Sequence, residues 1–330
     1  MNASIIICTR NRAENLRETL ASLGAVNIPA GLRPEILVVD NGSSDHTAEV
    51  VRKHPAARIP IRYVSEPVAG KARALNTGLA QVKGDILLFT DDDLRFPAQW
   101  LESMCELIAD KKADAMAGNV ELAPHLKKPW MTLTHRSWLA STERLDPVEP
   151  LDLVGANMAF ARSVLDVVPA FDVEIGPPHG ACEETLFALQ LRKAGKKLGR
   201  CQGPAAVHYF EEDRLARPHW LRMAKRMGHS QRYIDYHWRH DKVKIPTLRS
   251  MRALAHYYFY RLLKWRECSS SEGAPEWELL CVYAIHYLAR YNVESQRPYN
   301  YDLEGLVKIR GHLETPKPAP TFEGTPAVAH

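Results

Sequence analysis

The sequence lacks the patterns that mark several large classes of protein. Its six cysteines lie far apart, with no CxxC pair and no histidine at the spacing of a zinc site, so we interpret them as reduced thiols. No run of 18 or more apolar residues occurs that would span a bilayer as a helix. Neither GxGxxG nor GxxxxGK[ST] is present, which leaves a dinucleotide-binding fold and a P-loop without support.

An excess of one charge is also missing. The chain has 43 Lys and Arg against 39 Asp and Glu, a formal net charge of +4, so we do not expect nucleic acid as a partner. The N-terminal residues enter an apolar run at once, without the basic stretch and cleavage site of a signal peptide. We therefore expect a cytoplasmic protein whose contact with a membrane, at its inner face, is peripheral.

The first 120 residues alternate short apolar runs with helical patterns. The runs are residues 4–9, 36–40, 61–64 and 86–90. Because they are apolar on both faces, they are typical of strands buried in a parallel sheet, and the helical patterns between them predict right-handed crossovers. We expect an α/β fold, with ligands bound where the carboxyl ends of the strands open into loops.

The clearest polar signal at a strand end is Asp91-Asp92-Asp93, directly after the run 86–90. Adjacent carboxylates repel one another, and a compact fold holds them readily when a cation offsets their charge. Mg²⁺ and Mn²⁺ take oxygen ligands, keep only one or two protein carboxylates and fill the remaining positions with phosphates and water. The alternative is a solvated acidic turn that caps the next helix.

Three other strand-end segments carry polar or cationic residues. Arg10 and Arg12 follow the first run at a predicted helix N-terminus, where they would meet an anion or form surface charges. The segment 40–47 either binds a ligand or forms a tight turn and helix cap. The segment 70–78 opens another helix with cationic side chains near the open edge of the sheet.

These segments, taken in order, resemble the motifs of family 2 glycosyltransferases over about the first 210 residues. The resemblance implies a GT-A type sheet flanked by helices, and an inverting transfer of a sugar from a nucleoside diphosphate sugar, by default a UDP-sugar. It also implies a divalent metal, Mn²⁺ or Mg²⁺, held by the DxD residues Asp91 and Asp93 and by His208. The nucleotide-sugar-binding residues that it implies are Thr9, Arg10, Arg12, Asp40, Gly70, Arg73, Asn76, Asp91 and Asp92.

The resemblance extends to a second block on the acceptor side, which includes Asn157 and the loop residue His179. Within it Glu183-Glu184 stands where the family usually has Glu-Asp. An inverting transfer needs one base to take the proton of the acceptor hydroxyl, and Glu184 occupies the position of that base. Either glutamate would serve chemically, and the alternative is that both begin a helix whose dipole favours acidic residues.

On this basis the chain divides into four parts. Residues 1–120 form the nucleotide-sugar-binding half, 121–210 the acceptor-side half with the acidic pair, 211–312 a basic and mostly helical C-terminal extension, and 313–330 a disordered tail. The predicted function is transfer to a glycan or lipid-linked acceptor in polysaccharide or glycolipid synthesis. The alternatives are a sugar-1-phosphate nucleotidyltransferase, for which a Gly-rich phosphate loop is missing, and an inactive glycan-binding relative.

The C-terminal part contains a basic amphipathic segment. Residues 214–244 carry nine Lys or Arg and two acidic residues, with apolar residues interleaved at near-helical spacing. Such a helix either lies on an anionic membrane surface or receives a phosphate-bearing acceptor, or it packs on the catalytic part with a solvated basic face.

Overall fold

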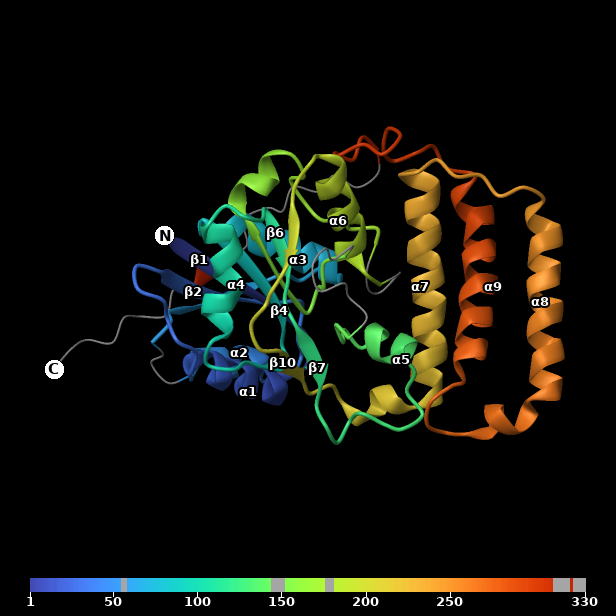
Figure 1. Cartoon of the computed structure of the whole chain (residues 1–330), viewed down its shortest axis with the longest axis horizontal. Coiled ribbons are helices and arrows are strands. Elements are labelled where there is room, and N and C mark those ends of the chain that lie inside the picture. Colours follow the sequence, from blue (N-terminus) through green and yellow to red (C-terminus); the bar gives the residue numbers. More distant parts are fainter. Residues whose placement is uncertain (55–57, 144–151, 176–180, 311–320, 323–330) are drawn as a thin grey trace.

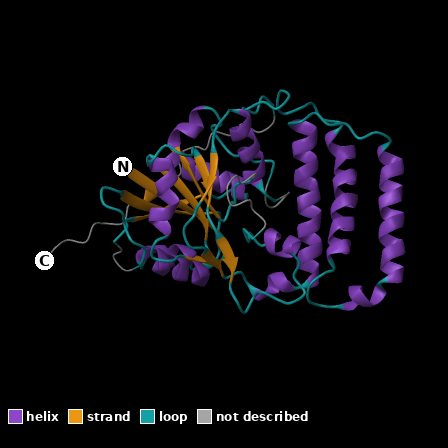
Figure 2. Cartoon of the chain, viewed as in Figure 1, coloured by secondary structure: helices purple, strands orange, loops and turns teal. Residues whose placement is uncertain are grey.

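The computed structural model describes residues 1–54, 58–143, 152–175, 181–310 and 321–322. Its centre is a mixed sheet in the order β11-β3-β2-β1-β4-β8-β6-β9. The four strands predicted from the apolar runs are parallel neighbours in this sheet: β1 (Asn2–Thr9), β2 (Arg33–Asp40), β3 (Ile61–Ser65) and β4 (Ile86–Asp91). The predicted α/β architecture is therefore confirmed (Figure 2).

The sheet continues into the second half of the chain. β8 (Asn157–Ala161) runs antiparallel to β4, and β6 (Ala115–Ala117) joins β8 to β9 (Leu198–Arg200). A smaller sheet contains β5 (Leu94–Arg95), β10 (Ala206–His208) and β7 (Val120–Leu122). Of the tail expected to be disordered, only Thr321–Phe322 is described, as β11 paired with β3, and the rest lies outside the described residues.

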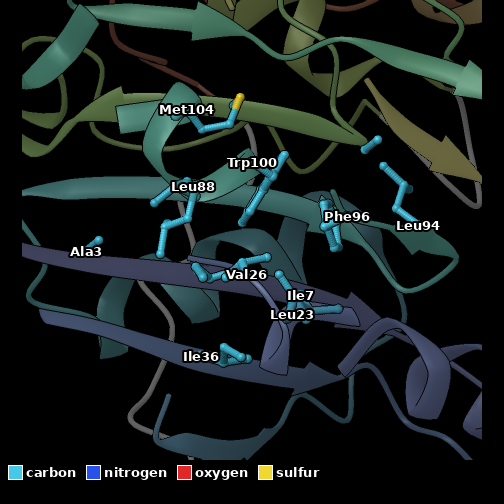
Figure 3. Packing of buried hydrophobic residues seen from close by; sticks show 14 of the residues in the cluster. Ala3, Ile7, Leu23, Val26, Ile36, Leu88, Leu94, Phe96, Trp100 and Met104 are labelled. Atoms are coloured by element: carbon cyan, nitrogen blue, oxygen red, sulfur yellow. The ribbon is translucent and has the colours of Figure 1, made fainter. Parts of the chain in front are cut away.

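Helices cover both faces of the main sheet because successive side chains of its strands point to opposite sides. On one face Ile5 and Ile7 pack with α1 (Ala13–Gly24), α2 (Thr47–Arg52) and α4 (Trp100–Ala109), as Figure 3 shows for part of this core. On the other face Ile6 packs with α3 (Lys71–Gln81) and α6 (Glu183–Lys193). The result is a three-layer arrangement in which the main sheet lies between two layers of helices.

The C-terminal extension is a layer of three long helices beside this core, and α5 (Leu133–Trp138) lies between the two (Figure 1). The layer contains α7 (Arg217–His237), α9 (Glu276–Glu294) and α8 (Pro246–Leu263), in that order moving outward. α7 lies closely against α9, since a Cβ added to Gly228 would come within 2.4 Å of the Tyr283 carbonyl oxygen. Three short 3-10 turns complete the described elements: Arg162–Asp166, Glu212–Leu215 and Trp265–Ser269.

The basic segment of residues 214–244 is not a free surface. Its central helix is α7, whose residues Trp220, Ala224 and Ile234 are buried between the core and the neighbouring helices. The Arg232 side chain is also buried, with its guanidinium 4.0 Å from the centre of the Tyr287 ring on α9. Packing against the α/β core and the neighbouring helices therefore describes this helix better than contact with a membrane. In the part of the chain that the structure describes, no helix combines the length and hydropathy needed to cross a bilayer.

Candidate functional site

The register of the central strands brings the polar strand ends to one edge of the sheet. Thr9 of β1 is paired with Asp40 of β2, and its neighbour Cys8 is paired with Asp91 of β4. A pocket of about 540 Å³ opens at this edge, and we call it the strand-end pocket. Its lining residues include Thr9, Arg10, Arg12, Asn41, Gly70, Lys71, Asp91, Asp92, Glu211, Asp213, Arg214, His219, Met223 and Arg226.

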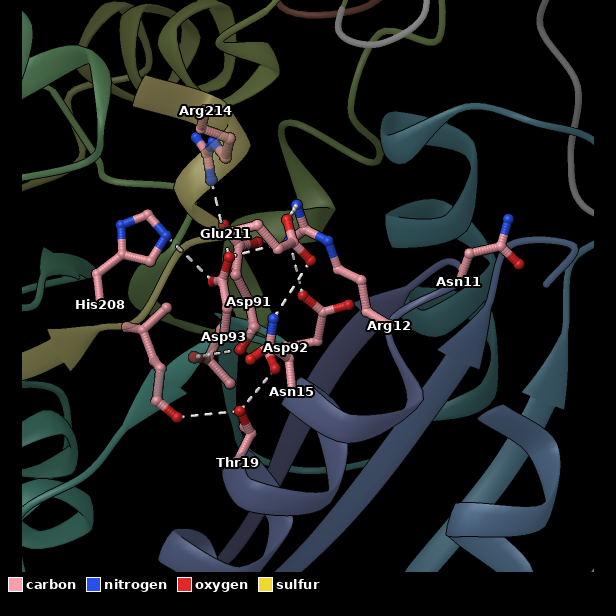
Figure 4. A network of polar contacts seen from close by, with 12 residues as sticks. Asn11, Arg12, Asn15, Thr19, Asp91, Asp92, Asp93, His208, Glu211 and Arg214 are labelled. Atoms are coloured by element: carbon pink, nitrogen blue, oxygen red, sulfur yellow. Dashed lines mark hydrogen bonds and ion pairs between the residues drawn. The ribbon is translucent and has the colours of Figure 1, made fainter. Parts of the chain in front are cut away.

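The three consecutive aspartates are held by cations from three distant elements, and Figure 4 shows two of these cations, Arg12 and Arg214. Lys71 at the start of α3 lies 2.9 Å from Asp91 Oδ1. Arg12 lies 3.1 Å from Asp92 Oδ1 and 2.9 Å from Asp93 Oδ2, and Arg214 lies 3.7 Å from the same Asp93 oxygen. Asp92 and Asp93 are buried, and α4 begins only at Trp100, so a solvated turn capping the next helix is wrong.

The surroundings shift the pKa values of the two buried aspartates in opposite directions. Burial raises the pKa of Asp92 to about 6, against the opposing charge of Arg12. Burial also acts on Asp93, but the neighbouring His208, Arg12 and Arg214 outweigh it and hold the pKa of this carboxyl below its ordinary value. Asp93 is thus an anion fixed between cationic partners.

Asp93 and His208 offer a pair of ligand atoms suited to a divalent metal. His208 Nε2 lies 3.2 Å from Asp93 Oδ1, and both atoms are buried without a hydrogen bond of ordinary geometry. The other ring nitrogen, Nδ1, lies 2.8 Å from the Leu139 carbonyl oxygen. A carbonyl only accepts, so Nδ1 carries a proton, and Nε2 is the ring nitrogen that faces the carboxylate. Such a carbonyl-oriented imidazole beside a carboxylate fits Mn²⁺ or Mg²⁺.

The third expected ligand does not join this pair. Asp91 turns its carboxylate to Lys71, and among the described residues no three His, Cys, Asp or Glu side chains come together as a metal site. Two protein ligands agree with a metal that completes its coordination with phosphate and water, as Mg²⁺ usually does.

The acidic pair lies in a second pocket of about 390 Å³, which we call the carboxylate pocket. Glu183 and Glu184 begin α6, after Cys182 in a left-handed conformation with φ of 60°. Glu183 is buried, with Oε1 3.6 Å from Lys71 Nζ. The two pockets share four lining residues and therefore adjoin: Lys71, Asp91, Arg214 and Met223.

Glu184 has the electrostatic character of a general base. Burial, and then the charge of Glu183, raise its pKa to about 8, although Lys71 acts in the opposite direction. The backbone N–H groups of Glu184 itself and of Gly155 donate to its carboxylate. A Cβ added to Gly155 would lie 3.1 Å from the Glu184 carboxyl carbon, so glycine at this position leaves room for the carboxylate.

Several expected site residues do not reach either pocket. The Asn76 amide is engaged at both ends by the backbone of Phe171, at 2.8 and 2.9 Å. Asn157 accepts from the Trp100 ring nitrogen at 3.0 Å and donates to the Asn119 carbonyl oxygen at 3.0 Å. Their side chains therefore stabilise the fold instead of facing a ligand.

Two further residues expected in the site have other positions or contacts in the structure, and a third cannot be placed. Asp40 accepts hydrogen bonds from the Ser43 N–H and the Tyr63 hydroxyl, both at 2.8 Å, so it fixes the loop after β2. Arg73 is not among the residues that line the strand-end pocket. His179 lies outside the described residues.

The structure also adds residues that sequence reasoning did not select. Lys71 joins the two pockets, Glu211 lies 2.9 Å from Arg12, and Arg214 reaches Asp93. Lys71 could have been selected from the sequence, because it directly follows Gly70 in the cationic segment 70–78. Arg214 could have been selected as well, because it begins the basic segment of residues 214–244. Glu211 could not, since it lies in the loop after β10, 199 residues from the Arg12 side chain that it approaches.

Comparison with known proteins places this geometry in a family. Residues 4–168 match the model of Glycosyl transferase family 2. Glycosyltransferase AglE of Haloferax volcanii is 37% identical over 119 residues, which are 36% of this chain and 39% of AglE. The probable glycosyltransferase YdaM of Bacillus subtilis is 24% identical over 272 residues, 78% of this chain and 61% of YdaM.

A third relative is the dolichol-phosphate mannosyltransferase of Pyrococcus furiosus, 30% identical over 135 residues, 39% of this chain and 38% of the relative. The matched segments thus span between about two fifths and three fifths of these relatives' lengths.

Among solved structures, the mannosyltransferase PcManGT of Pyrobaculum calidifontis, in complex with GDP-Man and Mn²⁺, has the same fold. It aligns with a TM-score of 0.58 at 20% identity, over 88% of this chain and 86% of PcManGT. This likeness supports the expected architecture of a central sheet with flanking helices. Since the family match covers half of the sequence and includes the strand-end motifs, the chain belongs to glycosyl transferase family 2.

Proposed function

We propose that the protein transfers a sugar from a nucleoside diphosphate sugar to a glycan or lipid-linked acceptor, with inversion at the anomeric carbon. One observation carries this proposal: a cation-rich pocket beside Asp93 and His208 adjoins a second pocket that contains Glu184. An inverting transfer requires this pairing of an anion-binding site with a base on the other side of the reacting carbon.

The donor lies in the strand-end pocket. Its diphosphate meets the cationic side chains there, which come from the loop after β1, the start of α3 and the C-terminal extension: Arg10, Arg12, Lys71, Arg214 and Arg226. Asp93 and His208 would hold a divalent metal, and this metal would supply positive charge beside the departing nucleoside diphosphate. We propose a UDP-sugar as donor, with the GDP-mannose bound by PcManGT as the first alternative.

The acceptor lies in the carboxylate pocket, where Glu184 takes the proton of the attacking hydroxyl. Its raised pKa makes it a stronger base than an exposed glutamate, and the Gly155 backbone N–H donates a hydrogen bond to its carboxylate. Trp138, Met223 and Met227 supply aromatic and apolar surface for a sugar ring or a lipid-linked glycan. The name of the Pyrococcus furiosus relative includes a lipid phosphate, which supports the second kind of acceptor.

A donor panel tests the proposal. UDP-, GDP- and dTDP-sugars are incubated with Mn²⁺ or Mg²⁺, and release of the nucleoside diphosphate is followed for the wild type, Asp93→Ala, Glu184→Gln and Glu183→Gln. We expect release with one donor class and its loss in Asp93→Ala and Glu184→Gln. Unchanged rates in both variants would refute the mechanism, and loss in Glu183→Gln alone would make Glu183 the base. No turnover with any donor, despite binding of glycans, would favour an inactive relative.

A further inference from the structure

The outermost helix of the protein, α8, has an unpartnered apolar face. Figure 1 shows α8 at the edge of the three-helix layer, with α9 between it and α7. No residue of α8 is buried, and its less exposed residues Ser250, Ala253, Tyr257 and Tyr260 recur at the spacing of one helix face. That face packs on α9, so the opposite face is directed away from the molecule.

The outward face is apolar along the whole helix. At 3.6 residues per turn, its residues fall within an arc of roughly 140° that contains one charged side chain, Arg252. Its large apolar members are between 49% and 75% exposed: Leu248, Met251, Tyr258, Phe259, Leu262 and Leu263. Isolated exposed leucines are ordinary, but a continuous apolar face on a helix marks a binding surface.

The charge carried by the segment that contains this face has one sign. Residues 242–266 contain seven Lys or Arg and no Asp or Glu. Arg249 lies at one side of the apolar arc, and Arg261 lies beyond its other side, 3.8 Å from Glu278 of α9. Trp265 follows the end of the helix with 61% of its surface exposed. An apolar face bordered by arginines and ended by tryptophan is the composition of helices that lie in the interface of an anionic bilayer.

We propose that α8 docks the protein on an anionic lipid bilayer, with its apolar face buried at the headgroup boundary and its arginines against lipid phosphates. A second copy of the chain fits the outward face of α8 less well than a bilayer does. A twofold dimer through this face would bring Arg252 and Arg249 of both copies into one interface, with no acidic residue on this helix to offset them. The proposal does not rest on the transfer reaction, since docking requires no turnover.

Vesicle sedimentation with the full chain tests the proposal. We expect binding to vesicles of phosphatidylcholine with phosphatidylglycerol, weak binding to phosphatidylcholine alone, and release at high salt. Leu262→Glu places a charge at the most exposed apolar position and is expected to lower vesicle binding roughly tenfold or more. Arg252→Glu is expected to lower binding to the anionic vesicles and to flatten its salt dependence.

The control is Leu303→Glu, the same change at a leucine that is 63% exposed and lies outside α8. It should leave vesicle binding intact, and all variants should keep the wild-type melting temperature, because the altered side chains are exposed. Equal binding of the wild type to both kinds of vesicle, or unchanged binding of Leu262→Glu, would overturn the proposal. The proposal would also be overturned if the wild type did not bind vesicles but formed a dimer in analytical ultracentrifugation that Leu262→Glu abolished.

Discussion

The pH dependence of transfer follows from the surroundings of Glu184. Burial and the charge of Glu183 raise the pKa of Glu184 to about 8, and the base must be ionised to accept a proton. A carboxyl with this pKa is ionised in roughly one molecule in eleven at pH 7 and in ten of eleven at pH 9. We therefore expect kcat/KM to rise about tenfold between these pH values and then to level off.

Removing the neighbouring charge moves this profile in a known direction. Glu183 disfavours ionisation of Glu184, so Glu183→Gln lowers the pKa of Glu184 and shifts the rising limb to lower pH. The ratio of the rate at pH 9 to the rate at pH 7 should consequently fall below the wild-type ratio. Glu121→Gln, which removes an exposed carboxylate on β7, is the matched control and should leave the profile unchanged.

The assay is nucleoside diphosphate release at substrate concentrations below KM, measured from pH 6 to pH 9.5 with the metal concentration held constant. A flat profile over this range would contradict a base with a raised pKa. If the rising part of the pH profile of Glu183→Gln lies at the same pH as in the wild type, the charge of Glu183 does not act on Glu184. If Glu183→Gln is inactive while Glu184→Gln is active, Glu183 is the base instead of Glu184.

Three further perturbations test separate parts of the structure. Gly155→Ala brings a Cβ to 3.1 Å from the Glu184 carboxyl carbon, and the displaced base should lower kcat about tenfold with KM little changed, in steady-state kinetics. Gly228→Ala forces α7 away from the Tyr283 carbonyl oxygen, and urea unfolding should report a loss of about 1–3 kcal/mol. His208→Ala removes one ligand of the proposed metal site and should weaken Mn²⁺ binding in the presence of nucleoside diphosphate about tenfold or more, measured by electron paramagnetic resonance.

The sheet and its open edge were predictable because they depend on local patterns. Each apolar run is long enough for one buried strand, and the parallel order of β1 to β4 requires their carboxyl ends to lie together. The strand-end positions of Thr9, Asp40 and Asp91 follow from that rule alone. This is why the strand-end edge on which the candidate site lies could be outlined from the sequence.

The direction in which a side chain points was not predictable in the same way. Asn76 and Asn157 lie in motif segments, yet each turns into the core and satisfies buried backbone or indole groups. A sequence motif gives the residue type at a position, whereas the partner of an amide depends on which distant backbone passes beside it. Phe171, the partner of Asn76, is 95 residues away along the chain.

The charges of the C-terminal extension show the same limit. The sequence indicated a basic helix in residues 214–244, but only the packing of α7 shows where its cations go. Arg214 and Arg226 line the strand-end pocket, and Arg232 is buried against Tyr287. The helix with the outward apolar face is α8, which carries fewer charges per residue than α7.

The balance of charge in the strand-end pocket has a consequence for the order of binding. Five cationic side chains line it with four carboxylates: Arg10, Arg12, Lys71, Arg214 and Arg226 with Asp91, Asp92, Glu211 and Asp213. A divalent cation arriving alone adds positive charge near arginines already paired with Asp93, which is unfavourable. A diphosphate with its metal brings little net charge and gives those arginines new partners. We therefore expect Asp93 and His208 to bind Mn²⁺ tightly only when a nucleoside diphosphate is present, and equal affinity in calorimetry with and without it would contradict this account.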